Sequence, residues 1–390
     1  MFKMIGQIGR IGLISLIIPQ VTTAGEAKPE FRTDANNDES LEWYQIEPGK
    51  FPPEGSAHYF AGELIGIDPI NRKGALRPDR TDTQRRSHWD RTVQFALLPY
   101  AKVMYNGAYA ELRDIPLGTH LHGLFYKRDP KAPRLNLPGA YGRMHVEADF
   151  SRCFLLEDDF SHRQRLGQAW RVESVNHEEN KLEATLLQIE GVDGKPSSVE
   201  GKPATFDLMP YTRVLVGNRV TGLKALEKGQ LIHFNLTWAT LYGRGRITAI
   251  WADEEARNLA TRHQANVHQA FIKEHGFPGW VEAVDNEQKL VTISLFSNVE
   301  PKLYDVMKEG EGHSLLVAEP TLRTYDQVND RKNGPIVKIE KLDPQPGFSG
   351  VQIQHKPDLL LEGYRQGRIV RIVPGTWGLI SIPLEERLWP

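Results

Sequence analysis

Apolar and polar residues alternate along the segment 230–238. The even-numbered positions from Ile232 to Trp238 are all apolar, and His233, Asn235 and Thr237 stand between them. An apolar period of two residues over this length indicates a strand with one face buried. A leucine-rich turn that ends at Gly229 precedes it. Segments of this kind, separated by glycine-bearing turns, recur along the chain and predict a mainly β protein.

The strand pattern recurs within the chain. The segment 99–104 (PYAKVM) matches 210–215 (PYTRVL) at a shift of 111 residues. The same shift pairs Gly118 with Gly229 and His122 with His233. A second match relates 170–175 (WRVESV) to 280–284 (WVEAV). Internal similarity of this kind is typical of repeated structural units.

These matches predict tandem small β-barrels, resembling OB-type five-stranded barrels and joined by short helices. The expected units are 56–150, 168–252 and 278–390, the third being the most diverged. A linker helix is expected over 253–277, because Asp253 offers an N-cap and Gly276 a stop. Its apolar stripe includes Ala256, Leu259, His263, Val267 and Phe271. The stretch 155–167 is expected to be the corresponding helix between the first two units.

The N-terminus has the layout of an export signal. Lys3 and Arg10 are basic, residues 11–18 (IGLISLII) are apolar, and small residues precede a cleavage position after Ala24. The apolar run is too short to span a bilayer. We therefore expect a signal peptide over 1–24, a flexible leader over 25–55, a mature chain without a membrane span, and a secreted or periplasmic location.

Composition narrows the function classes. The formal net charge is −2, with 48 Lys and Arg against 50 Asp and Glu. This balance does not suggest a nucleic-acid-binding protein. The single cysteine, Cys153, cannot form an intrachain disulfide and is expected to be a buried small residue, with a reactive thiol or metal ligand as the alternative.

Two histidines form the sharpest candidate for a metal site. His120 and His122 are two residues apart on an expected strand, so both side chains point to one face. Two imidazoles on one face suit a divalent transition metal. The expected metal-ligand set is His120, His122, His88 and Asp90, with His145 as another source of the third ligand. A solvent-facing pair without metal is the alternative.

A charged segment precedes the second expected strand group. It runs from Asp79 to Asp90 and combines arginines, aspartates, a histidine and a tryptophan. Such a segment suits a ligand-binding pocket, or else a surface loop held by ion pairs of small net value. The candidate ligand-binding residues are Arg80, Asp82, Arg85, Arg86 and Trp89.

Three short sequence segments give the chain a resemblance to a known group of proteins. They are 80–82 (RTD), 85–90 (RRSHWD) and 117–123 (LGTHLHG). On these residues the chain resembles uncharacterised secreted proteins of planctomycete-type bacteria. The resemblance implies no known activity and transfers no catalytic residues.

The sequence contains no motif of a known catalytic class. It therefore favours a secreted, non-enzymatic binding or structural protein of the cell envelope, with an envelope component, polysaccharide or protein as partner. No cofactor is expected under this hypothesis. The alternative hypothesis is a metal-dependent enzyme with its site in the first unit.

Overall fold

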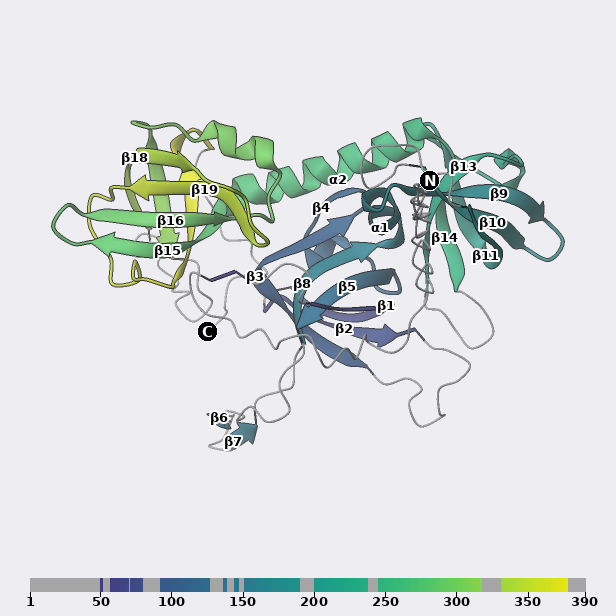
Figure 1. Ribbon diagram of the computed structural model, residues 1–390, viewed down its shortest axis with the longest axis horizontal. Coiled ribbons are helices and arrows are strands. Elements are labelled where there is room, and N and C mark those ends of the chain that lie inside the picture. Colours follow the sequence, from purple (N-terminus) through teal and green to yellow (C-terminus); the bar gives the residue numbers. More distant parts are fainter. Residues whose placement is uncertain are drawn as a thin grey trace, which may run out of the picture. The chain divides into compact units, whose positions relative to one another are not determined.

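The fold is mainly β and is built from three small barrels in tandem, which confirms the predicted fold class (Figure 1). The computed structural model describes residues 50–51, 57–69, 71–79, 92–126, 136–138, 144–146, 151–189, 200–237, 245–317 and 331–377. The expected signal peptide over 1–24, and the expected leader up to residue 49, lie outside the described residues.

Barrel 1 closes from five strands. Its strands follow the order β2-β1-β5-β8-β3, and β2 pairs with β3 to complete the circle. Only β3 and β8 run parallel. The elements are β1 (His58–Asp68), β2 (Lys73–Pro78), β3 (Val93–Tyr105), β4 (Ala108–Tyr109), η2 (Leu112–Asp114), β5 (His120–Tyr126) and β8 (Ser151–Asp158). Strands β6 (Asn136–Pro138) and β7 (Met144–Val146) form a separate two-stranded sheet.

Strand β8 corrects the expected end of the first unit at residue 150. It pairs with both β3 and β5, so barrel 1 cannot close without residues 151–158. The helix expected over 155–167 is correspondingly shorter. Helix α1 (Asp159–Arg165) begins where β8 ends, and the Asp158 side chain caps it by accepting a hydrogen bond from the Ser161 amide at 2.8 Å.

Barrel 2 has the same connectivity. Its order is β10-β9-β13-β14-β11, closed by the β10–β11 pair, with β11 and β14 parallel. The elements are β9 (Gln168–Asn176), β10 (Lys181–Gln188), β11 (Glu200–Val216), β12 (Arg219–Thr221), η4 (Leu223–Ala225), β13 (Leu231–Leu236) and β14 (Arg246–Trp251). In both barrels the first strand pairs with the second and fourth, and the third with the second and fifth. This is the OB arrangement.

The proline of the matched PY pair has a structural explanation. Strand β3 pairs with β2 through its first residues and with β8 on both sides of a register shift; β11 pairs in the same way with β10 and β14. The register shifts between Leu97 and Lys102 in β3, and between Leu208 and Arg213 in β11. Pro99 and Pro210 lie inside these shifts. Proline cannot donate to a β-ladder, so it fits where the pairing is interrupted.

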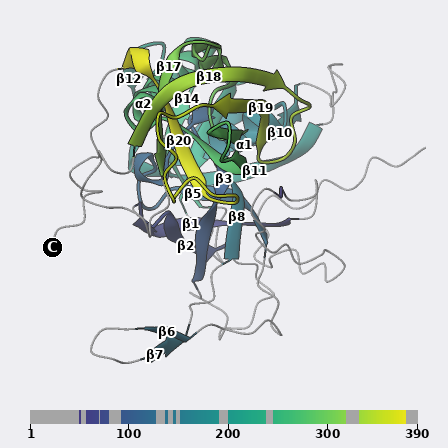
Figure 2. The same cartoon turned by 90° about the vertical axis from the view of Figure 1, so that its left-hand side faces the viewer.

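Barrel 3 is closed by six strands, and every pairing among its described residues is antiparallel. Its order is β15-β16-β19-β18-β17-β20, which differs from that of an OB-type unit. Figure 2 shows β18 as a long curved strand of this barrel. The elements are β15 (Phe277–Asp285), β16 (Leu290–Phe296), η5 (Pro301–Val306), β17 (Gly312–Val317), β18 (Arg331–Lys341), β19 (Phe348–His355), β20 (Ile369–Pro374) and η7 (Gly375–Trp377).

Each barrel encloses its own apolar core. Phe95, Phe125 and Leu156 are among the buried residues of barrel 1. Phe206, Phe234 and Trp170 pack together in barrel 2, with ring centroids about 5 Å apart. Barrel 3 encloses a mostly aliphatic core. Cys153 is fully buried in the core of barrel 1, where burial raises the pKa of its thiol, so it is a packing residue rather than a reactive one.

Helix α2 (Glu254–His275) occupies the position expected for the linker helix. It ends at Gly276, whose positive φ of 84° suits glycine. Its buried face differs from the predicted stripe, because His263 and Val267 are exposed whereas Gln264 and His268 are buried. The Gln264 side chain donates hydrogen bonds to the Tyr109 carbonyl and to Asp114, so polar partners on barrel 1 orient this face. No helix among the described residues has the length and apolar character needed to cross a membrane.

The cap of α2 predicts a measurable loss of stability. Asp253 accepts hydrogen bonds from the Ala256 amide at 2.7 Å and from the Gly217 amide at 2.8 Å. We expect Asp253→Ala to lower the free energy of unfolding by about 1–2 kcal/mol, measured by urea denaturation. Asp253→Asn keeps an acceptor oxygen and should lose less. An alanine variant as stable as the original chain would contradict the capping role.

Candidate functional site

The candidate site is built on β5. His120 and His122 point to the same side of this strand, as their spacing predicts, while Leu121 between them is buried in the core of barrel 1. The histidines are not solvent-facing, because their side chains are 0% and 1% exposed. A face of β5 that lies outside the barrel core is therefore covered by other parts of the chain.

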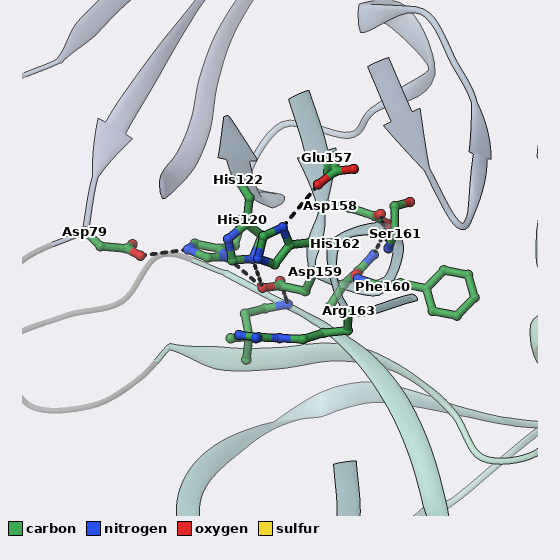
Figure 3. A network of polar contacts seen from close by, with 12 residues as sticks. Asp79, His120, His122, Glu157, Asp158, Asp159, Phe160, Ser161, His162 and Arg163 are labelled. Atoms are coloured by element: carbon green, nitrogen blue, oxygen red, sulfur yellow. Dashed lines mark hydrogen bonds and ion pairs between the residues drawn. The ribbon is translucent and has the colours of Figure 1, made fainter. Parts of the chain in front are cut away.

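The first residue of helix α1 joins the two histidines. Asp159 Oδ1 lies 2.8 Å from His120 Nδ1 and 3.0 Å from His122 Nε2 (Figure 3). The other oxygen of the carboxylate, Oδ2, accepts a hydrogen bond from the Leu236 amide at 2.8 Å. One aspartate thus contacts β5 of barrel 1 and β13 of barrel 2.

A second carboxylate lies on the opposite side of the His120 ring. Asp79, which directly follows β2, places Oδ2 2.7 Å from His120 Nε2, and both side chains are completely buried. Both ring nitrogens of His120 therefore face carboxylate oxygens. This arrangement raises the pKa of His120 well above its usual value, because the attraction of Asp159 and Asp79 outweighs desolvation.

His122 has a different environment. Its Nδ1 lies 2.6 Å from the Tyr59 hydroxyl, and its ring stacks on the His162 ring with centroids 3.8 Å apart. Burial and the neighbouring His162 hold the pKa of His122 well below its usual value. The His122 ring is therefore neutral at pH 7, with Nε2 directed at Asp159.

An ion pair between the buried Glu157 and the exposed Arg165 borders this pair of stacked rings. Glu157 lies 3.1 Å from His162 Nδ1 and accepts two hydrogen bonds from the Arg165 guanidinium, at 2.7 and 2.8 Å. These partners lower the pKa of Glu157 despite its burial. The carboxylates of 157, 158 and 159 thus occupy three different polar environments at one strand end.

Asp158 links the same strand end to both barrels. Its Oδ2 accepts hydrogen bonds from the Asn106 amide of barrel 1 at 3.0 Å and from the Asn235 side chain of barrel 2 at 2.8 Å. The side-chain oxygen Oδ1 of Asn235 in turn accepts from the Phe160 amide at 2.9 Å. Asn235 and His233 are accordingly buried, so the polar face of β13 packs on α1 and is not a solvent face.

The structure brings together part of the predicted set. It places His120 beside His122 and adds Asp159, and the donor atoms of these three residues lie within 4.8 Å of one another. Sequence reasoning missed Asp159 because it lies far along the chain from His120 and His122. The signal that could have found it is the acidic pair Asp158 and Asp159 at the end of an apolar strand, which is typical of a helix N-terminus. The side chain of His145 and the predicted residues of segment 80–91 lie outside what is described: His88, Asp90, Arg80, Asp82, Arg85, Arg86 and Trp89.

A separate cavity of about 350 Å³ lies between β3 and β4 on one side and the η5 and β19 regions on the other. Its wall combines aromatic rings and prolines with several polar side chains. The lining residues are Lys102, Tyr109, Ser297, Val299, Pro301, Tyr304, Pro344, Gln345, Pro346, Phe348 and Ser349. The Ser297 hydroxyl is buried and has no hydrogen-bond partner among the described residues.

Comparison of the chain with protein-family models, with curated proteins and with solved structures found no match. The molecule thus offers two features that bear on function: the cavity, and the His–Asp cluster formed by His120, His122, Asp159 and Asp79.

Proposed function

We propose that this chain is a secreted or periplasmic, non-enzymatic binding protein of the cell envelope, and that its ligand is an envelope polysaccharide. The observation that carries the proposal is the cavity described above. Its volume lies at the lower end of the range of small-molecule sites. A short stretch of a glycan, rather than a large folded partner, fits a site of this size.

The chemistry of the wall supports a carbohydrate. Of the three aromatic side chains in the wall, the half-buried Tyr109 exposes ring surface that suits the apolar face of a sugar ring, whereas Tyr304 and Phe348 are buried. Lys102 and Gln345 provide hydrogen-bonding groups for sugar hydroxyls. Small barrels of the OB type also include oligosaccharide-binding members.

The alternative, a metal-dependent enzyme in barrel 1, has one observation in its favour, the convergence of His120, His122 and Asp159. A catalytic metal keeps an open coordination position for water or substrate. These three side chains are only 0%, 1% and 5% exposed. Their burial favours a structural role for the cluster over a reaction centre.

The test is binding of oligosaccharides released from the envelope of the producing cell, measured by isothermal titration calorimetry. We expect Tyr109→Ala to weaken binding by at least about tenfold, which corresponds to about 1.4 kcal/mol. Tyr211→Ala is the matched control, because Tyr211 is an exposed tyrosine of barrel 2 outside the cavity wall. Equal effects of the two substitutions, or no binding of any released glycan, would refute the proposal.

Export is tested separately. N-terminal sequencing of the protein recovered from the periplasm or medium should give Gly25 as the first residue. Recovery of the intact N-terminus from the cytoplasm would contradict the proposed location and leave the binding measurement unaffected.

A further inference from the structure

We propose that a divalent transition-metal ion binds between His120 Nδ1, His122 Nε2 and Asp159 Oδ1, and that this ion locks the junction of barrels 1 and 2. The inference is independent of the glycan-binding proposal, because the cavity and the His–Asp cluster share no residue.

The first argument is the separation of the donor atoms. Zinc-type ions lie about 2.0–2.2 Å from imidazole nitrogen and carboxylate oxygen, so neighbouring donors in a tetrahedral site are about 3.3–3.6 Å apart. The two nitrogens lie 2.8 and 3.0 Å from Asp159 Oδ1. Small outward shifts of these side chains would therefore admit an ion among them.

The second argument is the support behind each ligand. The ring nitrogen of His120 that faces away from Asp159 lies 2.7 Å from the Asp79 carboxylate. The corresponding nitrogen of His122 lies 2.6 Å from the Tyr59 hydroxyl, and the second oxygen of Asp159 is held by the Leu236 amide. Outer partners of this kind orient metal ligands and fix the tautomer of a ligating histidine. Here all three ligands have one.

The third argument is charge. Two carboxylates, Asp79 and Asp159, are buried within one small cluster. Burying two negative charges is costly unless positive charge compensates them; a protonated His120 supplies one such charge, whereas a divalent ion supplies two at the point where the three donors converge. The cluster then becomes electrically balanced with neutral imidazoles.

The donor set indicates the class of metal. Imidazole nitrogen suits zinc, iron, cobalt and nickel, whereas calcium and magnesium prefer oxygen-only sites. The closed surroundings favour a structural ion. Because Asp159 begins α1 and also contacts β13, an ion held by β5 and Asp159 would join the two barrels.

The experiment uses the full chain, stripped with a chelator and titrated with Co²⁺ as a spectroscopic probe and with Zn²⁺ in competition. We expect one Co²⁺ per chain, with visible absorption bands of a nitrogen- and oxygen-ligated ion. His122→Asn should weaken Co²⁺ binding by at least about 100-fold. His233→Asn is the matched control, since His233 is a buried histidine at the corresponding position of β13 and should leave the titration unchanged.

A wild-type chain that takes up no Co²⁺ or Zn²⁺ at stoichiometric concentration would overturn the proposal, whatever the variants do. An equal loss of binding in the two histidine variants would also overturn it. If His122→Asn does not fold, Asp79→Asn serves instead, because it preserves side-chain volume. This change to the outer partner of His120 is expected to weaken binding by about 10–100-fold, and an unchanged affinity would count against the site.

Discussion

Asp159→Ala is expected to lower the free energy of unfolding of the metal-stripped chain by about 3–5 kcal/mol. The substitution removes the carboxylate that contacts both His120 and His122 and leaves the Leu236 amide without its acceptor. The charge on His120 would then be compensated only by Asp79 among the cluster residues. Urea denaturation at pH 7, followed by far-ultraviolet circular dichroism, measures the loss.

The control for this substitution is an ion pair of the same type at the surface. Glu179 and Lys181 form a fully exposed pair at 2.8 Å. Glu179→Ala should leave the urea midpoint unchanged, because exposed pairs contribute little. If Asp159→Ala were as stable as the Glu179 variant, the cluster would not hold the junction together.

Acid should destabilise the fold through three buried histidines outside the His–Asp cluster. Burial lowers the pKa of His233, His268 and His355 to about 4. The unfolded chain binds these protons below about pH 6.5, so the stability they contribute is present above that pH and is lost as the pH falls towards 4. Between pH 7 and 5 we expect a loss of about 2 kcal/mol for each histidine.

Burial is the main cause of the lowered pKa for all three rings, and the neighbouring groups act in both directions. Arg257 and Arg163 oppose the charge on His233. Asp114 favours the charge on His268 and Arg371 opposes it, while the backbone carbonyls of His313 and Gly334 favour the charge on His355. His120 has the opposite effect, because its pKa is raised in the folded chain. The stability that it contributes is fully present at low pH and is lost only as the pH rises through this raised pKa.

The measurement is urea denaturation at pH 7 and pH 5. His355→Gln should reduce the difference in unfolding free energy between the two pH values by about 2 kcal/mol, since it removes one of the three titrating groups. His177→Gln changes an exposed histidine in a turn and should leave the difference as it is. A stability that does not fall between pH 7 and 5 would contradict the prediction.

Strand periodicity was informative about one face only. The apolar positions Ile232, Phe234 and Leu236 are buried in barrel 2, as predicted. The intervening His233 and Asn235 are also buried, because α1 covers them and supplies hydrogen-bond partners. A polar residue on a strand therefore predicts a polar environment, which can be solvent or a buried network, and the sequence pattern does not distinguish the two.

The candidate site shows the same limit. The spacing of His120 and His122 was sufficient to place both rings on one side of β5. The position of Asp159 depends on barrel closure, which brings the end of β8 beside β5 through pairs such as Leu121 with Asp158. The predicted stripe on α2 failed for a related reason, since Gln264 is buried by partners on barrel 1 that sequence periodicity does not register.

The third barrel could not be derived from the internal matches. Residues 280–284 match only a first strand, and Trp280 does lie on the first strand of barrel 3. The order of strands in a barrel depends on which strands pair with two neighbours, and a match over one strand does not contain this information. Barrels 1 and 2 have a long third strand interrupted at Pro99 or Pro210, and barrel 3 instead closes from six strands that are all antiparallel.

The hydrogen bonds of the 157–159 segment also constrain the order in which the chain can fold. The last strand of barrel 1 ends at Asp158. The hydrogen bonds of Asp158 and Asp159 nevertheless require the Asn235 side chain and the Leu236 amide of barrel 2. In a polypeptide that emerges N-terminus first, nearly eighty further residues must therefore follow before the carboxylate of Asp158 has its hydrogen-bond partner in barrel 2. During that interval the carboxylates of Asp158 and Asp159 would be hydrated by water instead of paired with β13 of barrel 2.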